Sequence, residues 1–241
     1  MAHLIQLVAI KKMFKNHAVL DNLEFSVNKG DILGLIGKSG EGKTTFLRVL
    51  IGFYKIDAGI IMFEENDITK KTQQILKHVG FCTQDNSFYP ELTIEENMRY
   101  YGRLYGIKRK VLKERIEELL KLVNLYERKD KFGSDISGGM KRRLDFAIAL
   151  LHNPAILILD EPTAGLDPVM TKEIWNLIEK INQQGTTVIV SSHELDNLER
   201  KCNKIAVLNK GKIAVYTLAE IQRKYKNKPL IDVFEEIVKI N

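Results

Sequence analysis

A glycine-rich loop at residues 37–44 carries the most distinctive chemistry in the sequence. The loop consists of Gly37, Lys38, Ser39, Gly40, Glu41, Gly42, Lys43 and Thr44, and Thr45 follows it. An apolar run precedes the loop and a helix-like stretch begins at Thr44, so the order is strand, loop, helix, which a flexible surface turn would not need. In this order glycine allows backbone N–H groups to point at phosphates, and the helix N-terminus adds a partial positive charge. We therefore predict a nucleoside triphosphate site, in which Lys43 reaches the β- and γ-phosphates and Thr44 offers its hydroxyl to Mg2+.

Two adjacent carboxylates end the apolar run 155–159, which is long enough for a buried parallel strand. Such strands deliver their C-terminal residues to the ligand crevice, so Asp160 and Glu161 are expected near the phosphates. Asp160 would bind Mg2+, directly or through water, and Glu161 would accept a proton from the attacking water. The alternative is that both carboxylates are ordinary solvated residues at a strand end. The presence of a phosphate-binding loop in the same chain disfavours this alternative.

A third motif, which we call the signature, consists of Ser137, Gly138, Gly139 and Met140 and lies shortly upstream of the acidic strand. In this order and spacing the three motifs resemble the nucleotide-binding subunit of an ABC transporter. The resemblance implies an ATP-hydrolysing protein in which Ser137, Gly138 and Gly139 contact the γ-phosphate bound to the opposite subunit. Ser137 also fits a helix N-cap, and taken alone that structural interpretation would be preferred.

Four further positions match the family one by one. Gln84 resembles the glutamine that contacts Mg2+ and the nucleophilic water, and His193 resembles the histidine that hydrogen-bonds the γ-phosphate. Asp167 resembles the aspartate that crosses the dimer interface, although Asp167 and Pro168 also fit a helix N-cap and the first helical position. Phe14 falls where the family has an aromatic residue that stacks on the nucleobase, a contact with little preference for ATP over GTP. Each of these residues alone also has an ordinary structural explanation, such as a core phenylalanine or a strand-end histidine.

The sequence departs from the family pattern at a few positions. Glu41 replaces a small neutral residue, and its carboxylate would weaken nucleotide binding by like-charge repulsion unless the side chain points outward. Ile136 and Met140 replace the commoner Leu and Gln, but the phosphate contacts come from Ser137 and backbone amides, so we expect catalysis to survive. Residues 141–144 resemble the branch of the family that energises exporters of drugs and polysaccharides.

The composition is that of an ordinary globular subunit. The chain has 241 residues, 28% of them charged, and no stretch approaches the roughly 18 uninterrupted apolar residues of a membrane-spanning helix. We expect no signal peptide, and Cys82 and Cys202 are too few and too far apart in sequence to suggest a disulfide framework or a metal site. A reducing cytoplasm is the natural compartment. The net charge of +6 comes from interspersed signs, and no recognition helix or basic block supports nucleic-acid binding.

The order of strand-like and helix-like segments predicts one α/β domain over residues 1–241, and the resemblance implies a P-loop NTPase core with a mixed and parallel sheet. Residues 1–85 and 154–216 form that core, including an antiparallel N-terminal β-subdomain that the resemblance implies. Residues 86–153 are predicted as an inserted helical subdomain, residues 205–208 and 213–216 as a hairpin, and residues 217–241 as a helical tail.

The resemblance implies a dimer, because each ATP site needs Lys43 and Glu161 from one nucleotide-binding subunit and Ser137 from another, a copy or a paralogue. A separate integral membrane permease would dock at residues 87–92, where Phe88 and Tyr89 offer aromatic side chains that could equally be packing residues. The protein would then lie at the cytoplasmic face of the cell membrane and drive transport, with export favoured, of an unidentified substrate. Two alternatives stay open: a non-transport ABC ATPase acting on nucleic acid or ribosomes, and a small-molecule kinase, which would not explain the signature or His193.

Overall fold

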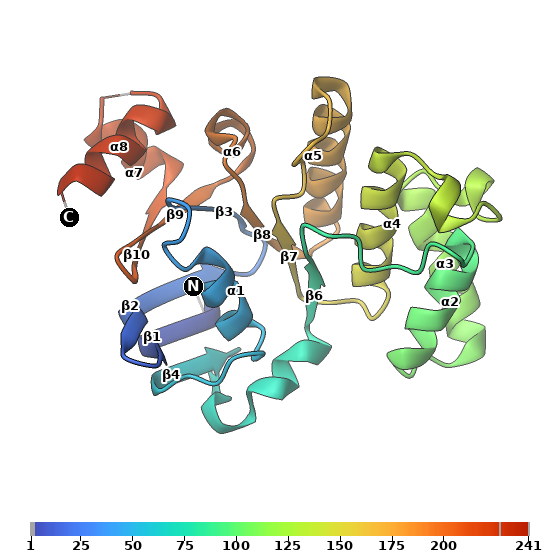
Figure 1. Cartoon of the computed structure of the whole chain (residues 1–241), viewed down its shortest axis with the longest axis horizontal. Helices are drawn as coiled ribbons and strands as arrows, with labels where there is room; N and C mark the ends of the chain where they lie inside the picture. The colour runs from blue at the N-terminus through green and yellow to red at the C-terminus, as the bar shows by residue number, and fades with distance from the viewer. Residues whose placement is uncertain (1–2, 227, 241) are drawn as a thin grey trace.

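The computed structural model describes residues 3–226 and 228–240 and confirms the predicted α/β fold class. Two sheets occupy the middle of the molecule, a group of helices lies at one end, and the last two helices lie at the other (Figure 1). Within the described ranges, no helix combines the length and the apolar character needed to cross a bilayer. Both cysteines, Cys82 and Cys202, are buried and free.

The smaller sheet is antiparallel, with strand order β2-β1-β4-β5. Its strands are β1 (His3–Phe14), β2 (His17–Asn28), β4 (Ala58–Phe63) and β5 (Asn66–Asp67). The apolar side chains of this sheet pack in one cluster with α1 (Lys43–Leu50) and with one face of the larger sheet. The predicted antiparallel N-terminal sheet is therefore confirmed, and it lies against the helix that follows the glycine-rich loop.

The larger sheet has the strand order β10-β9-β3-β8-β7-β6, and all its strand pairs are parallel except the edge pair of β10 and β9. Its strands are β3 (Ile32–Ile36), β6 (Val79–Cys82), β7 (Ile156–Asp160), β8 (Thr187–Ser191), β9 (Lys204–Asn209) and β10 (Lys212–Thr217). Alternation along β7 sends Leu157 and Leu159 to one apolar cluster and Ile156 and Ile158 to the other. Both faces of the central strands β3, β7 and β8 are buried, so these strands are apolar along their length, and polar residues occur at the ends of β7 and β8.

Three helices form the group at one end of the molecule, namely α2 (Ile94–Leu104), α3 (Arg109–Leu122) and α4 (Gly138–Leu150). Helices α5 (Pro168–Gln183) and α6 (Leu195–Lys201) contribute to the same apolar cluster as these three. Short 3-10 segments connect the larger elements, namely η1 (Thr69–Lys77), η2 (Tyr126–Arg128) and η3 (Gly133–Asp135). The regular elements between β6 and β7 are thus helices, with one isolated antiparallel bridge between Thr93 and Phe132.

The C-terminal part follows the predicted pattern of a hairpin and then helices. Lys210 and Gly211, with φ of 47° and 74°, form a two-residue turn in which Lys212 pairs with Asn209. The last helices are α7 (Leu218–Lys224) and α8 (Leu230–Ile240). Leu230, Val233 and Ile237 of α8 are buried, so this amphipathic helix packs on the rest of the protein.

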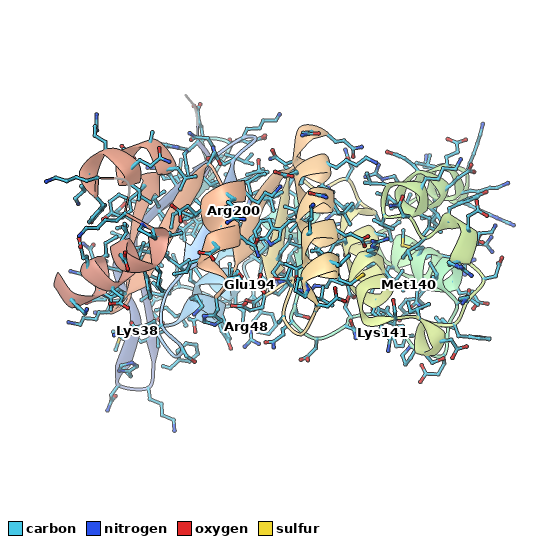
Figure 2. All side chains as sticks on the ribbon, turned by 90° about the horizontal axis from the view of Figure 1, so that it is seen from above. Lys38, Arg48, Met140, Lys141, Glu194 and Arg200 are labelled. Carbon is cyan, nitrogen blue, oxygen red and sulfur yellow. The ribbon has the colours of Figure 1, made fainter. Side chains whose placement is uncertain are left out.

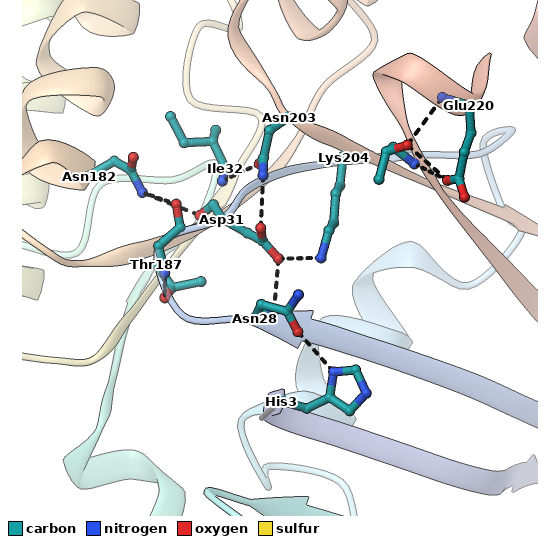
Figure 3. A network of polar contacts seen from close by, with 11 residues as sticks. His3, Asn28, Asp31, Ile32, Asn182, Thr187, Asn203, Lys204 and Glu220 are labelled. Atoms are coloured by element: carbon teal, nitrogen blue, oxygen red, sulfur yellow. Dashed lines mark hydrogen bonds and ion pairs between the residues drawn. The ribbon is translucent and has the colours of Figure 1, made fainter. Parts of the chain in front are cut away.

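A buried carboxylate fixes the start of β3 (Figure 3). Asp31 is 6% exposed, and its oxygens accept hydrogen bonds from Asn28 N, Asn203 Nδ2 and Lys204 Nζ, each at 2.8 Å. These contacts connect β2, β3 and β9 at one end of β3, and the glycine-rich loop leaves from the other end. The strand that carries the loop is therefore anchored at the end opposite the loop.

Candidate active site

The glycine-rich loop connects β3 to α1 in a backbone conformation that its glycines permit. Gly40 and Gly42 have φ of 83° and 99°, values that residues with a Cβ rarely adopt. A Cβ at Gly37 would lie 2.7 Å from the carbonyl oxygen of Leu208, so the loop passes directly against β9. Because Gly42 is the N-cap of α1, the unpaired N–H groups of the first helical turn follow the loop and are available to an anion.

Lys43 lies over the loop that contains it. Its Nζ donates to the carbonyl oxygens of Gly37 at 2.6 Å and Lys38 at 3.2 Å. Burial lowers the pKa of Lys43, whereas the carboxylates of Glu161 and Asp160 act in the opposite direction. The charges of both acidic residues at the end of β7 therefore act on the Lys43 ammonium group. The glycine-rich loop and the acidic strand end thus belong to one site.

The end of β7 is organised by a serine on the neighbouring strand. Ser191 Oγ donates a short hydrogen bond to Asp160 Oδ1, which fixes one oxygen of the predicted metal ligand. Glu161 N donates to both Ser191 O and Ser191 Oγ, each at 3.1 Å. The role of Ser191 leaves no signal in the sequence, because Ser191 and its partners become neighbours only when β7 and β8 pair.

Glu161 adopts a left-handed backbone conformation, with φ of 49°. Such values are uncommon for residues other than glycine and concentrate at functional sites. Its two hydrogen bonds to Ser191 stabilise this conformation. The left-handed residue interrupts the alternation of side-chain directions along β7 at the point where the strand ends. The carboxylate thereby reaches His193, whose Nε2 lies 3.2 Å from Glu161 Oε1.

The predicted residues meet around a cleft of about 380 Å3. Six of its lining residues come from the loop and the start of α1, namely Ser39, Gly40, Gly42, Lys43, Thr44 and Thr45. Four come from the ends of strands, namely Gln84 after β6, Asp160 as the last residue of β7 with Glu161 after it, and His193 after β8. Parallel strands present their C-terminal ends at one edge of a sheet, which explains how residues so distant in sequence come together.

The residues around this cleft fit a nucleotide-bound Mg2+. Mg2+ is usually bound by one or two protein oxygens together with substrate phosphates and water rather than by a full protein cage. Asp160 and Thr44 supply a carboxylate and a hydroxyl at the cleft, and Gln84 adds an amide oxygen. Across the described ranges there is no group of three or more His, Cys, Asp or Glu suited to a metal.

Glu41 points away from the cleft. Its Oε2 accepts a hydrogen bond from Lys210 N at 2.7 Å, so the side chain connects the loop to the β9–β10 turn. Glu41 does not line the cleft, and its carboxylate has a backbone partner on the hairpin, but its charge still acts on Lys43, where it opposes the lowering of the pKa by burial.

The remaining predicted residues are outside the cleft. Phe14 is 39% exposed at the end of β1 and makes an edge contact with Tyr54 at 5.2 Å between ring centroids. Within the described part of the chain, no signature residue lines the cleft. Figure 2 illustrates the separation: Lys38 of the loop and Lys141, next to the signature, lie far apart along the long axis.

Ser137 and Asp167 are exposed N-cap residues, as their sequence context predicts. Ser137 Oγ accepts from Met140 N at 3.3 Å, at the start of α4. Asp167 Oδ1 accepts from Val169 N at 2.8 Å and Met170 N at 3.0 Å, at the start of α5 with Pro168 as its first residue. Capping leaves both side chains on the surface, so the structural interpretation and a contact with a second subunit are compatible.

Comparisons with known proteins identify the family of the chain. The profile of the ABC transporter family matches residues 20–164, from β2 to just beyond the end of β7. The chain belongs to the ABC transporter family. Nod factor export ATP-binding protein I of Cupriavidus metallidurans is 36% identical over 212 residues, which are 88% of this chain and 70% of that protein. Linearmycin resistance ATP-binding protein LnrL of Bacillus subtilis is 36% identical over 220 residues, 90% of this chain and 70% of that protein.

Solved structures of ABC proteins share the fold over nearly the whole chain. The ATP-binding subunit of an ABC transporter superposes with a TM-score of 0.84 at 27% identity and covers 97% of this chain and 98% of that one. The ADP conformation of MJ1267, an ATP-binding cassette of an ABC transporter, gives a TM-score of 0.85 at 26% identity, with coverages of 97% and 99%. This ABC protein is accordingly a transporter's ATP-binding subunit, an ATPase whose hydrolysis is coupled to transport.

Proposed function

We propose that this ABC subunit hydrolyses ATP in a head-to-tail dimer whose two sites each combine the cleft of one subunit with the signature of the other. The carrying observation is the exposure of Ser137 and Gly138 at the start of α4, outside the cleft that contains Lys43 and Glu161. A helix N-terminus with an exposed hydroxyl suits an anion, and a two-fold axis would bring each signature to the partner's cleft. Asp167, exposed at the start of α5, would lie at the same interface.

Within each site the residues of this chain have separate roles. Lys43 and the loop N–H groups bind the β- and γ-phosphates of ATP, with Phe14 beside the base, while Thr44, Asp160 and Gln84 hold Mg2+. Bound Mg2+ would neutralise charge that develops on the phosphates. Glu161 accepts a proton from the attacking water, and His193 contacts the γ-phosphate. The side chain of His193 is 63% exposed and that of Glu161 only 17%, which suits a mobile contact beside a positioned base.

We further propose that a membrane permease docks on the loop after β6, with Tyr89 as a contact residue. One part of the sequence prediction is corrected, because Phe88 is 8% exposed and belongs to the apolar core. Tyr89 is 44% exposed and lies beside Tyr100, 5.0 Å away between ring centroids. Its backbone is fixed by Asn97, whose Oδ1 accepts from Tyr89 N at 2.8 Å and whose Nδ2 donates to Tyr89 O at 2.9 Å. A rigid exposed aromatic pair suits protein recognition.

Export is the proposed direction of transport, with the subunit at the cytoplasmic face of the cell membrane. The relatives named for Nod factor export and linearmycin resistance support this direction, as does the sequence at 141–144.

Dimer formation is tested with Glu161→Gln, which is expected to bind ATP without turning it over. Molar mass is measured by light scattering during gel filtration, with ATP and Mg2+ or with ADP. We expect a dimer with ATP and a monomer with ADP, and no ATP-dependent dimer when Ser137→Ala is added. A monomer under all conditions, or a dimer indifferent to Ser137, contradicts the composite site.

Docking is tested by purifying the tagged protein from detergent-solubilised membranes of the native cell. We expect a multi-spanning membrane protein in equal amount, and its loss from the Tyr89→Ala variant but not from Phe132→Ala, which also removes a half-exposed aromatic ring. Recovery with ribosomes or nucleic acid instead would favour a non-transport ATPase. If Tyr89→Ala still retains the membrane protein, the transporter function stands and the proposed docking at Tyr89 is contradicted.

A further inference from the structure

Two buried charged side chains lie one helical turn apart on α4, the helix that begins in the signature. Arg142 is 6% exposed and Asp145 is 2% exposed. Residues three apart share one helix face, and both side chains contact the segment that follows β6. We call Arg142 and Asp145 the α4 charge pair. Burial of charge is costly unless hydrogen bonds compensate, so the partners of this pair indicate what it stabilises.

Arg142 binds the ends of two strands at once. Its Nη1 donates to Thr83 O at 2.6 Å, its Nη2 to Asp160 O at 3.0 Å and its Nε to Pro162 O at 3.0 Å. These carbonyls belong to the residue before Gln84, to the proposed metal ligand, and to the residue after Glu161. A planar guanidinium with five donors in fixed directions can satisfy three such carbonyls, which a lysine ammonium on a flexible stem would not reproduce.

Asp145 binds the other end of the segment that contains Gln84. Its Oδ1 accepts from Ser87 N at 2.9 Å and from Ser87 Oγ at 2.8 Å. Burial raises the pKa of Asp145, and the Ser87 hydrogen bonds and the charge of Arg142 oppose that effect. Loop 83–87 is thus held at its first residue by Arg142 and at its last by Asp145.

We propose that Arg142 and Asp145 are positioning residues that make loop 83–87 move as one body with α4, so that the location of the signature helix sets the location of Gln84. This rests on the proposed roles of Gln84 and the signature. Binding of a partner at the start of α4 would reach Gln84 through side chains one turn further along the same helix. Through its hydrogen bond to Asp160 O, Arg142 would extend the coupling to that residue. Binding of a partner at the start of α4 would then shift both proposed Mg2+ ligands, Gln84 and Asp160.

Hydrogen exchange measures the loop contact independently of hydrolysis. Asp145→Asn keeps an oxygen that can accept from Ser87, whereas Asp145→Ala removes it. We expect backbone amides of loop 83–87 to exchange at least about tenfold faster in Asp145→Ala, because both partly buried hydrogen bonds to Ser87 are lost, and to stay near the unmodified rate in Asp145→Asn. Equal protection in both variants would overturn the proposal.

Kinetics separates positioning from general destabilisation. Because the phosphate loop is untouched, we expect Arg142→Lys and Asp145→Ala to lower kcat about tenfold or more while the Kd for a fluorescent ATP analogue changes less than about twofold. Asp145→Asn should recover most of kcat. Parallel losses of kcat, ATP affinity and thermal stability would indicate a merely structural role and refute the proposal. If Asp145→Ala does not fold, Ser87→Ala removes one contact from an exposed residue, and unchanged exchange and kcat there count against the proposal.

Gln84→Ala is measured beside these variants to keep the two hypotheses apart. Unchanged hydrolysis in Gln84→Ala would remove the assigned role of Gln84 while the exchange experiment still reports on the α4 charge pair. Loss of hydrolysis in Gln84→Ala with unaltered exchange in Asp145→Ala would retain the proposed function and refute the coupling.

Discussion

Nε2 of His193 lies 3.2 Å from Oε1 of Glu161, and His193 N donates to Oε2 of the same carboxylate at 3.3 Å. The proposed base and the proposed γ-phosphate contact therefore form one unit across β7 and β8. Both residues follow the C-terminal ends of their strands, and Ser191 connects those ends through hydrogen bonds to Asp160 and to Glu161 N. Substitution of either member of the pair should affect hydrolysis more than nucleotide binding.

His193→Ala should lower kcat about tenfold to a hundredfold, because the γ-phosphate loses a donor and Glu161 loses a neighbour. His193→Gln, whose amide can donate at a similar reach, should recover part of the loss. Steady-state phosphate release measures kcat, and a fluorescent ATP analogue measures binding. Equal kcat in unmodified protein and His193→Ala would exclude the residue from the reaction.

Glu161→Gln should lower kcat by roughly a hundredfold or more, since removal of a general base commonly costs that much. ATP affinity should change little, because the amide is similar in size to the carboxylate and does not contact the loop. Single-turnover hydrolysis with excess protein is the measurement, since it excludes product release as the limiting step. Turnover near the unmodified rate would require another base.

Glu41 provides a test of loop anchoring against charge repulsion. Glu41→Gln keeps an oxygen for Lys210 N and removes the charge, whereas Glu41→Ala removes both. We expect Glu41→Gln to bind ATP within about twofold of the unmodified protein and Glu41→Ala to bind it about fivefold more weakly, near 1 kcal/mol for one hydrogen bond. Equilibrium titration with nucleotide measures both affinities. Tighter ATP binding by both variants would show that repulsion by the Glu41 charge outweighs the hydrogen bond to Lys210 N.

His152 makes stability depend on pH below neutrality. Burial, with smaller effects from His78 and Arg115, lowers the pKa of His152, and its Nε2 lies 3.1 Å from Val79 O. The folded-state pKa is below the ordinary value of about 6.5, so the neutral ring stabilises the fold above that pH and this contribution is lost as the pH falls toward the folded-state value. His152→Gln retains a donor for Val79 O and does not titrate.

Chemical unfolding of both proteins between about pH 7.5 and 5 measures this effect. The free energy of unfolding should fall more steeply with decreasing pH in the unmodified protein than in His152→Gln. Parallel curves would mean that His152 does not contribute to the pH dependence.

The local sequence was sufficient for features that depend on neighbouring residues. The glycine spacing at 37–44, the apolar strand before Asp160, the N-caps Ser137 and Asp167 and the turn at Lys210 all reflect short-range backbone requirements, and the structure contains each of them. The sequence also predicted that the strand-end residues lie in one site, because the C-terminal ends of parallel strands lie at the same edge of a sheet. The direction of the Glu41 side chain and the burial of Phe88 could not be decided in this way.

What the sequence by itself determined is the set of chemical groups and their order along the chain, because backbone conformation and hydrophobic periodicity are local properties. Tertiary structure alone decided which distant groups meet. Ser191 reaches Asp160 only through the pairing of β7 with β8, and Arg142 reaches Thr83 and Asp160 only because α4 packs beside both strands. Hydrogen bonds of this kind connect residues without any fixed sequence spacing, so no local pattern records them.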